Sequence, residues 1–474
     1  MQARDGAKHK SAASGKRPGH EGIPDGWSSP RLFVLAAAGA AIGFNNFWQF
    51  PAITAQYGGG AFLIVYLAGV ALLGLPLLMA EIMLGRRGRA SPITTFWRLA
   101  QSSRSDPNWV VVGWLAVTGG FLVFCYLNVI AAWTLAFALR SALGTFSGLT
   151  ADGIAAVFTA LVRDPEKQLF WHALFVGVTM AVVARGVRDG IEVVTRWALP
   201  LALVLLAGLA AYAGTTDGMM RALASVFLPD FTRLDSAGLI TAVGHAFFSL
   251  GLGVGVIVMY SAYADGEFST ARAAVSIAAI DTVVGLVAAL TVFALLYAGG
   301  VDPAAGPALV FQALPLAFDH LAGGRLLGTA FFVLLAIIAW LAAIALAQPA
   351  IAWLQEWRAW SRLRAAVACG TGAWLLGVGF ILSFNHWAFS FPFFGSVKKF
   401  GLFDVAQILT AHTLLPLCGI LTALFAGWAL RPATTHEWLG VRSLCGFDAW
   451  LWLNRLGVAI LLSIVVLNFS DLFA

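Results

Sequence analysis

The chain has 474 residues, of which 60% are hydrophobic and 11% are charged, with 18 Trp and 35 Phe. A water-soluble domain of this size cannot bury so much apolar surface, so the composition excludes a soluble protein and predicts a polytopic α-helical membrane protein. The formal net charge of +6 fits a membrane surface better than nucleic acid. Four scattered cysteines without a CxxC pair indicate neither a disulfide framework nor a metal site.

The chain divides into a tail and one membrane domain. Residues 1–26 are polar and rich in Gly, Ser and Lys, which predicts a disordered basic cytoplasmic tail without a cleavable signal peptide. Residues 27–474 are predicted to form a single transmembrane domain. Its eleven expected spans cover about residues 30–55, 59–85, 108–142, 168–186, 191–213, 238–264, 270–299, 325–356, 365–384, 404–430 and 448–472.

Basic residues orient these spans. Lys and Arg gather before the first span, between the second and third, and after the fourth and eighth, which all lie on one side of the membrane. Since cytoplasmic loops carry an excess of Lys and Arg, we expect a cytoplasmic N-terminus. Lys398 and Lys399 are a minor exception. An odd number of spans then puts the C-terminus outside.

Two spans are interrupted. The breaks contain Gly39, Gly43, Asn45 and Asn46 in the first span and Gly251, Gly253 and Gly255 in the sixth. A break at bilayer depth exposes backbone groups that lipid cannot satisfy, so it must be buried in protein or line a polar cavity. Broken helices five spans apart predict inverted repeats of about residues 30–213 and 238–430, with an extra helix at about 448–472, and a binding site at the membrane midplane. Glycines that only permit close helix packing are the less favoured alternative.

Two loops are long, external and partly apolar, as expected of lids. They cover residues 300–324 and 385–403.

Several stretches carry a resemblance to a known family. They are GWSSPRLFVLAAAGAAIGFNNFWQFP, YGGGAFLIVYLAGVALLGLPLLMAEIMLGR, GHAFFSLGLGVG and LFDVAQILTAHTLLPLCGILTALFAGW. With them the chain resembles the bacterial neurotransmitter:sodium symporter family from Trp27 to its end. The resemblance implies an all-α fold of two five-helix inverted repeats, alternating access, and sodium-coupled uptake of amino acids or related zwitterions across a bacterial plasma membrane.

The resemblance implies a first sodium site. Its ligands would be the Ala41 carbonyl oxygen and the side chains of Asn46, Ser249 and Asp281. Hard cations prefer several oxygen ligands, one of them charged. Asp281 lies in an apolar run, and an ionisable group at bilayer depth indicates a functional site; a protonated Asp bonded to a helix backbone is the alternative. Because Asp281 supplies the negative charge that chloride gives some relatives, we expect no chloride dependence.

The second sodium site of the family is degenerate here. The carbonyls of Gly39 and Ile42 remain, but Leu341 and Ala342 occupy the positions of the family's Thr and Ser. Too few oxygen ligands are left to replace the hydration shell of a cation. We expect this site to be lost, or rescued by a water or a shifted residue.

The expected substrate pocket is apolar. The family's helix-3 Tyr falls on Leu127, and Tyr126 lies one position earlier, about 100° away around the helix. The substrate carboxylate would therefore meet the backbone N–H groups of Phe44 and Asn45 and the sodium ion. Gly43 occupies the position of an Asp in monoamine carriers, which favours a small hydrophobic amino acid. The remaining lining residues would be Val123, Phe248, Gly251, Val254, Ala345 and Leu346.

Both gates depart from the family pattern. The external Arg and Asp are replaced by Gln49 and Gln407, which can hydrogen-bond without leaving an unpaired charge. Glu356 occupies the acidic position of the cytoplasmic gate, but Pro24 replaces its Arg partner. We expect a neutral external gate, and a cytoplasmic gate that is weak or uses the basic tail.

Three further residues have open roles. Glu81 matches a family motif and is expected to bond the unwound part of helix 6. Tyr66 and His245 lie in the region where relatives bind chloride, where Gly285 replaces a serine. His245 is a candidate proton site, although a hydrogen-bonded structural histidine is the favoured interpretation.

The leading hypothesis is a sodium-coupled secondary transporter of a small-molecule amino acid. A proton-coupled or uncoupled carrier on the same fold and a non-transporting amino-acid sensor are the alternatives. No nucleophile–base pair, P-loop or metal cluster suggests an enzyme.

Overall fold

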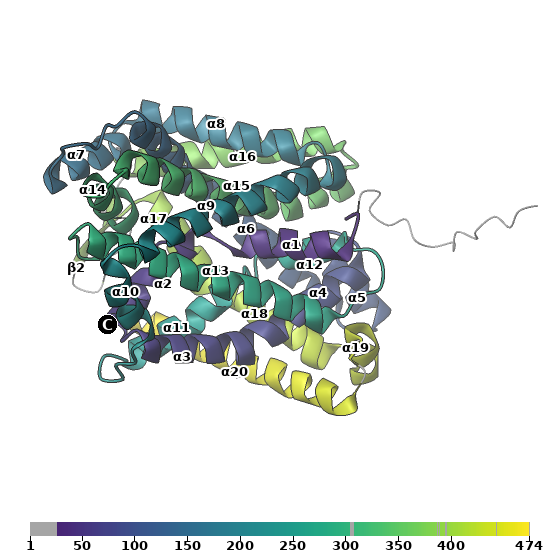
Figure 1. Cartoon of the computed structure of the whole chain (residues 1–474). Helices are drawn as coiled ribbons and strands as arrows, with labels where there is room; N and C mark the ends of the chain where they lie inside the picture. The colour runs from purple at the N-terminus through teal and green to yellow at the C-terminus, as the bar shows by residue number, and fades with distance from the viewer. Residues whose placement is uncertain are drawn as a thin grey trace, which may run out of the picture.

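The computed structural model describes residues 26–303, 308–385, 387, 389–393, 396–441 and 443–473. The predicted tail therefore lies, apart from Gly26, outside the described residues. The long helices share one axis and form a bundle (Figure 1). We call the end of the bundle where the chain enters, near α5 (Pro92–Ser102) and α19 (Pro432–Leu439), the N-terminal end. The opposite end holds α7 (Ala151–Val162) and α14 (Leu314–Asp319) (Figure 1).

The helices of the first half of the chain include both intact and broken membrane helices. They are α1 (Pro30–Ala41), α2 (Gln49–Gln56), α3 (Gly60–Gly69), α4 (Leu75–Gly88), α5, α6 (Val110–Ala142), α7, α8 (Pro165–Val183) and α9 (Val193–Gly214). A π-helical turn (Val70–Gly74) joins α3 to α4, and another (Val187–Glu192) leads into α9. The predicted broken first span is α1, a 3₁₀ turn (Phe44–Asn46) and α2.

The second half contains the other broken helix and further long helices. Its helices are α10 (Gly218–Phe227), α11 (Ser236–Ser249), α12 (Val256–Ala262), α13 (Thr270–Ala298), α14, α15 (Gly324–Arg358), α16 (Arg362–Ser383), α17 (Leu402–Ile408), α18 (Leu415–Leu424), α19 and α20 (Leu444–Phe473). π-Helical turns precede α14 (Leu309–Ala313), join α17 to α18 (Leu409–Leu414) and follow α18 (Phe425–Ala429). The broken sixth span is α11 followed by α12.

Eight helices of the described chain are long and apolar enough to cross a membrane. They are Gly60–Gly88, Pro107–Ala142, Val187–Gly214, Thr270–Ala298, Gly324–Arg358, Arg362–Ser383, Leu402–Ala429 and Leu444–Leu467. The other three predicted spans are the two broken helices and the 19-residue α8. The predicted all-α membrane fold is confirmed.

The two broken helices begin alike and break differently. Ser29 Oγ accepts the Leu32 N–H to cap α1, and Asp235 Oδ1 accepts the Gly238 N–H to cap α11. The chain leaves α1 through Gly43, whose backbone is extended. The break after α11 instead uses three glycines with φ of +63, +78 and +73 at residues 251, 253 and 255. Only glycine adopts that region without strain, so the glycine run encodes the second break.

The long helices pack in pairs that hold these breaks in the centre. The two longest, α6 and α15, lie against each other through the core, and α8 lies beside α16 at the edge of the bundle (Figure 1). On the other side α12 packs on α4, and α20 packs on α18. The breaks are therefore surrounded by continuous helices, which shield their backbone groups from lipid.

The two predicted lid loops have regular structure. In the first, the π-helical turn Leu309–Ala313 and α14 fold inward, and Phe311 is fully buried. In the second, an antiparallel hairpin pairs β1 (Phe389–Phe393) with β2 (Ser396–Phe400). The expectation that these segments act as lids stays a prediction.

Candidate functional site

The first break and α13 meet at a buried polar pair. Asn46 Nδ2 donates to Asp281 Oδ1 at 2.9 Å, and lies 3.4 Å from the Asp281 main-chain oxygen. Asn46 is 3% exposed and Asp281 is fully buried. The structure therefore brings together two of the side chains expected in the first sodium site, although 235 positions separate them in the chain.

Oxygen atoms around this pair lack protein partners. Asn46 Oδ1 and Asp281 Oδ2 are buried and accept no hydrogen bond from the described chain. No backbone N–H of the described residues donates to the carbonyls of Gly39, Ala41 and Ile42, where α1 ends. Buried oxygens without donors are costly, and a hard cation such as Na⁺ takes that kind of ligand. The donor set fits a cation.

Three hydroxyl groups border the same carboxylate. Ser249, the last residue of α11, faces Asp281, and Tyr66 Oη lies 3.4 Å from Ser249 Oγ. The Tyr66 hydroxyl also faces Thr282. Sequence reasoning missed Thr282, although its position directly after Asp281 was the available signal. Asn46 and Ser249 thus lie beside the Asp281 carboxylate, whereas no hydrogen bond of the described residues joins Ala41 to it.

His245 is packed as an aromatic ring. Its imidazole stacks on Phe50 with ring centroids 5.3 Å apart and lies 5.7 Å from the ring of Tyr66. No ion pair joins His245 to Asp281 among the described residues. These contacts are those of a packed aromatic ring, and the candidate proton role of His245 stays a prediction.

Glu81 makes the contact expected from the sequence. Its Oε1 atom accepts the N–H of Gly253 at 2.8 Å, inside the break between α11 and α12. Glu81 lies on α4 and is 1% exposed. A backbone donor that the break frees is therefore satisfied by a neighbouring helix, which stabilises the break.

The region of the second sodium site is apolar. A Cβ atom on Gly39 would meet methyl groups of Leu341 and Leu199 at 3.6 and 3.7 Å. Leu341 and Ala342 are both buried. Leu199 was not anticipated, and it adds a further hydrocarbon side chain where the family's site needs oxygen.

The two breaks face open space. A Cβ atom on Gly251 would meet nothing within 4 Å, and one on Gly43 would meet only two backbone atoms of its own break, at 3.6 and 3.9 Å. The side chains expected to line this space differ in their exposure. Those with partial exposure are Val123, Tyr126, Leu127 and Phe248, whereas Phe44, Val254, Ala345 and Leu346 are buried. The backbone N–H groups of Phe44 and Asn45 have no acceptor in the described chain.

Tyr126 turns away from the break, as its one-residue offset predicts. Its ring contacts Phe403 with ring centroids 6.0 Å apart, and its hydroxyl faces Thr410 in the π-helical turn that joins α17 to α18. It therefore joins α6 to the π-helical turn Leu409–Leu414.

The glutamines of the external gate do not pair. No hydrogen bond joins Gln49 to Gln407 among the described residues, and Gln49 is exposed. Aromatic rings lie beside this position instead: Phe311 stacks on Phe44 at 6.2 Å and on Phe158 at 5.2 Å, and contacts Phe137 at 5.0 Å. Sequence reasoning missed Phe311, because nothing in the sequence indicated that residues 309–313 fold inward.

Glu356 does not act as a free gate residue. Its carboxylate accepts hydrogen bonds from the backbone N–H and hydroxyl of Ser91 at 2.7 and 2.6 Å, and from the Thr94 hydroxyl at 2.5 Å. These groups form the N-terminus of α5. Glu356 thus fixes α5 against the end of α15, and its expected place in a cytoplasmic gate that is weak or uses the basic tail stays a prediction.

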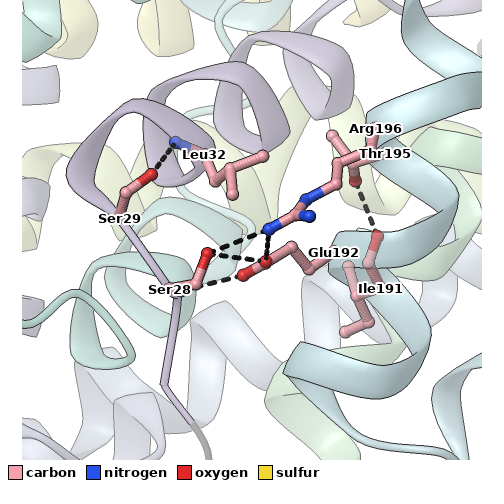
Figure 2. Close-up of polar contacts among 7 residues, drawn as sticks. All are labelled: Ser28, Ser29, Leu32, Ile191, Glu192, Thr195 and Arg196. Carbon is pink, nitrogen blue, oxygen red and sulfur yellow. Dashed lines mark hydrogen bonds and ion pairs between the residues drawn. The ribbon is translucent and has the colours of Figure 1, made fainter.

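A different carboxylate closes the N-terminal end. Figure 2 shows Glu192, at the end of the π-helical turn that leads into α9, bonded to the segment that precedes α1. Its two oxygens accept the Ser28 N–H at 2.8 Å and the Ser28 hydroxyl at 2.7 Å, and Arg196 Nη2 donates to Oε1 at 2.5 Å. Next to it, Trp27 donates its indole N–H to the Tyr260 carbonyl at 2.8 Å. We call residues 27 and 28, which these contacts hold in place, the strap.

Comparisons with known proteins decide the family. The model of the sodium:neurotransmitter symporter family matches residues 25–147 and 166–389. The chain belongs to this family.

Two bacterial relatives and one solved structure match nearly the whole chain. The symporter is 32% identical over 450 residues to the uncharacterized sodium-dependent transporter YhdH of Bacillus subtilis, which covers 94% of this chain and 97% of the relative. It is 30% identical over 457 residues to an uncharacterized sodium-dependent transporter of Haemophilus influenzae, with coverage of 94% and 98%. The solved structure of MhsT in complex with L-phenylalanine superposes with a TM-score of 0.84 at 34% identity, over 94% of this chain and 99% of that one.

The symporter is therefore a multi-pass membrane protein that transports a small molecule with sodium, and it is not an enzyme. The sequence-based identification of the family is confirmed.

Proposed function

We propose that the symporter couples the inward movement of one hydrophobic amino acid to sodium bound at a single site. The observation that supports this is the set of unpartnered oxygens of Asn46 and Asp281 beside the helix-1 break. The Ser249 hydroxyl and the free Ala41 carbonyl complete a set of four oxygen ligands. The hydrocarbon environment of Gly39, Leu341 and Ala342 argues against a second bound cation.

The open space beside Gly43 and Gly251 is the proposed substrate position. A substrate carboxylate there would accept the free N–H groups of Phe44 and Asn45, with sodium as its counter-ion. No acidic side chain lines the break to hold a basic amine. An apolar side chain on the substrate suits the walls formed by Phe248 and Val254, and the relative of known structure binds L-phenylalanine.

Alternating access is the proposed mechanism. At the N-terminal end the strap and Glu192 close the path between α1 and α9. At the other end of the bundle Gln49 remains exposed. Transport requires the strap to open while the aromatic cluster around Phe311 seals the opposite end. Because Lys and Arg gather at the N-terminal end, that end is assigned to the cytoplasm.

Chloride independence is proposed from Asp281. Its carboxylate supplies a fixed negative charge next to the sodium ligands, so no anion is needed for charge balance. Gly285 leaves a position where a Cβ atom would lie 3.4 Å from Asn46 Nδ2. Uptake in proteoliposomes should be equal when chloride is replaced by gluconate, and a loss of more than half of the uptake would contradict the proposal.

The sodium site is tested by uptake of labelled L-phenylalanine into proteoliposomes under an inward sodium gradient, an inward proton gradient, or neither. We expect accumulation with sodium only. Asp281→Ala should abolish it, and Asp281→Asn should weaken sodium activation at least tenfold because a neutral oxygen replaces a charged ligand. Asp302→Asn, on an exposed loop, is the matched control. Proton-driven uptake, or sodium-driven uptake retained by Asp281→Ala, would refute the site.

A further inference from the structure

A second cavity lies away from the two breaks. It has a volume of about 830 Å³ and is found at the end of the bundle opposite to the strap. The end of α6 and the turn after it (141–147) form one wall, and the junction of α14 with α15 (315–329) forms the other. Among the residues that line it, Asp319 and Arg325 are the charged ones.

Each charged side chain is held in place by one backbone contact. Asp319 Oδ2 accepts the N–H of Gly148 at 2.9 Å, and Arg325 Nε donates to the carbonyl of Ala142 at 2.7 Å. These bonds use one carboxylate oxygen and one guanidinium nitrogen. No other hydrogen bond or ion pair of the described chain engages either charge, so Asp319 Oδ1 and the two terminal nitrogens of Arg325 stay available.

The two charges do not neutralise each other. They line the same cavity, yet they do not approach within the 4 Å that defines an ion pair. Both side chains come from the α14–α15 wall, and each is anchored at a different point of the facing wall, since Ala142 ends α6 and Gly148 follows it. A fixed acid and a fixed base that share one space without contact match a ligand that carries both charges.

We infer that this cavity binds a small zwitterion, an amino acid with free α-amino and α-carboxyl groups. The carboxylate would accept from the Arg325 guanidinium, and the ammonium group would donate to Asp319 Oδ1. The buried rings of Phe146 and Phe318 lie among the lining residues and offer an apolar surface to the ligand's side chain. An inorganic anion would leave Asp319 unpaired, and a simple cation would leave Arg325 unpaired.

The walls of this cavity connect to the central site through ring contacts. Phe318 contacts Phe331 at 5.7 Å, which contacts Phe47 after the helix-1 break at 6.4 Å. A ligand that fixes the α14–α15 junction therefore favours the inward-folded position of the neighbouring residues 309–313. A filled cavity would slow the escape of a substrate from the central site.

The test uses the full chain in lipid nanodiscs. Binding of L-phenylalanine is titrated calorimetrically in sodium chloride and in choline chloride; the choice of this amino acid rests on the proposed function. The central site needs sodium, so binding that persists in choline reports the second cavity. We expect one such site per chain, weakened at least tenfold by Asp319→Asn or Arg325→Gln. Asn still offers an oxygen to the Gly148 N–H, which keeps the fold intact.

Matched controls are Arg221→Gln and Asp302→Asn, which break an exposed ion pair at the same end of the bundle and should leave binding in choline unchanged. Asp281→Ala should remove only the sodium-dependent component, which separates this inference from the proposed transport. Phenylpropionate and phenethylamine, each with one charge, should bind at least tenfold more weakly than L-phenylalanine. The inference is overturned by an absence of binding in choline, by full binding in both cavity variants, or by equal binding of either analogue.

Discussion

Glu192 holds the strap, and its replacement by glutamine tests that role. The carboxylate is 2% exposed and accepts both the N–H and the hydroxyl of Ser28. Gln keeps one acceptor oxygen, but its amide nitrogen cannot accept, so one of the two bonds is lost and the other loses its charge. Hydrogen bonds to a buried charged group each contribute about 1.5–3 kcal/mol. We therefore expect Glu192→Gln to destabilise the closed strap by roughly 2–3 kcal/mol.

That free energy corresponds to a population of the open strap that is roughly 30- to 150-fold larger, at 1.36 kcal/mol per factor of ten. Hydrogen–deuterium exchange of the Trp27 amide measures it. This amide donates to the Tyr263 carbonyl at 3.1 Å and does not touch Glu192, so its exchange accelerates only if the whole strap opens.

The control is Arg196→Gln. Its side chain is 58% exposed, and solvent-exposed ion pairs contribute about 0.2–1 kcal/mol, so exchange should rise by no more than about fivefold. Exchange of the Trp27 amide in Glu192→Gln within threefold of the wild-type rate would refute the assignment of Glu192 as the residue that holds the strap closed.

Two further changes address other parts of the chain. Replacing Leu341 by Thr together with Ala342 by Ser restores hydroxyl ligands near the Gly39 carbonyl. The Hill coefficient for sodium-driven uptake should then rise from about 1 toward 2. A Hill coefficient near 2 for the wild-type protein would contradict the single sodium site. Gly377→Ala would place a Cβ atom 2.0 Å from Nε2 of the buried His172, so the thermal midpoint should fall by the equivalent of about 1–3 kcal/mol. His172→Ala should rescue it, and an additive loss in the double variant would show that this contact is not the cause.

The sequence predicted the centre of the molecule better than its ends. The two breaks follow from local chemistry, since glycines with left-handed backbone at Gly251, Gly253 and Gly255 cannot continue a helix. The grouping of Asn46 with Asp281 followed from the family resemblance, and in the structure Asn46 Nδ2 donates a hydrogen bond to Asp281 Oδ1. Neither step required knowledge of how loops fold.

The ends depend on contacts between distant segments. Ser28 and Glu192 are 164 positions apart, and in the sequence Glu192 is only an acid at the start of an apolar run. The inward fold of Phe311 depends on rings from four other elements. Glu356 was assigned to a gate from the family resemblance, and the sequence did not indicate its contacts to Ser91 and Thr94. Neutral hydroxyl and backbone partners leave no complementary pattern that a sequence could show.

The proposed single sodium site has a consequence for how membrane voltage acts on the transport cycle. In that proposal an ionised Asp281, one sodium ion and a zwitterionic substrate make the loaded central site electrically neutral, so the loaded step is insensitive to voltage. The empty site carries one negative charge, and one elementary charge across the membrane is worth about 2.3 kcal/mol per 100 mV. In a cell that is negative inside, the potential therefore favours the return of the empty carrier to face outward. A chloride-dependent carrier that releases its anion with the sodium would lack this driving force on its return step.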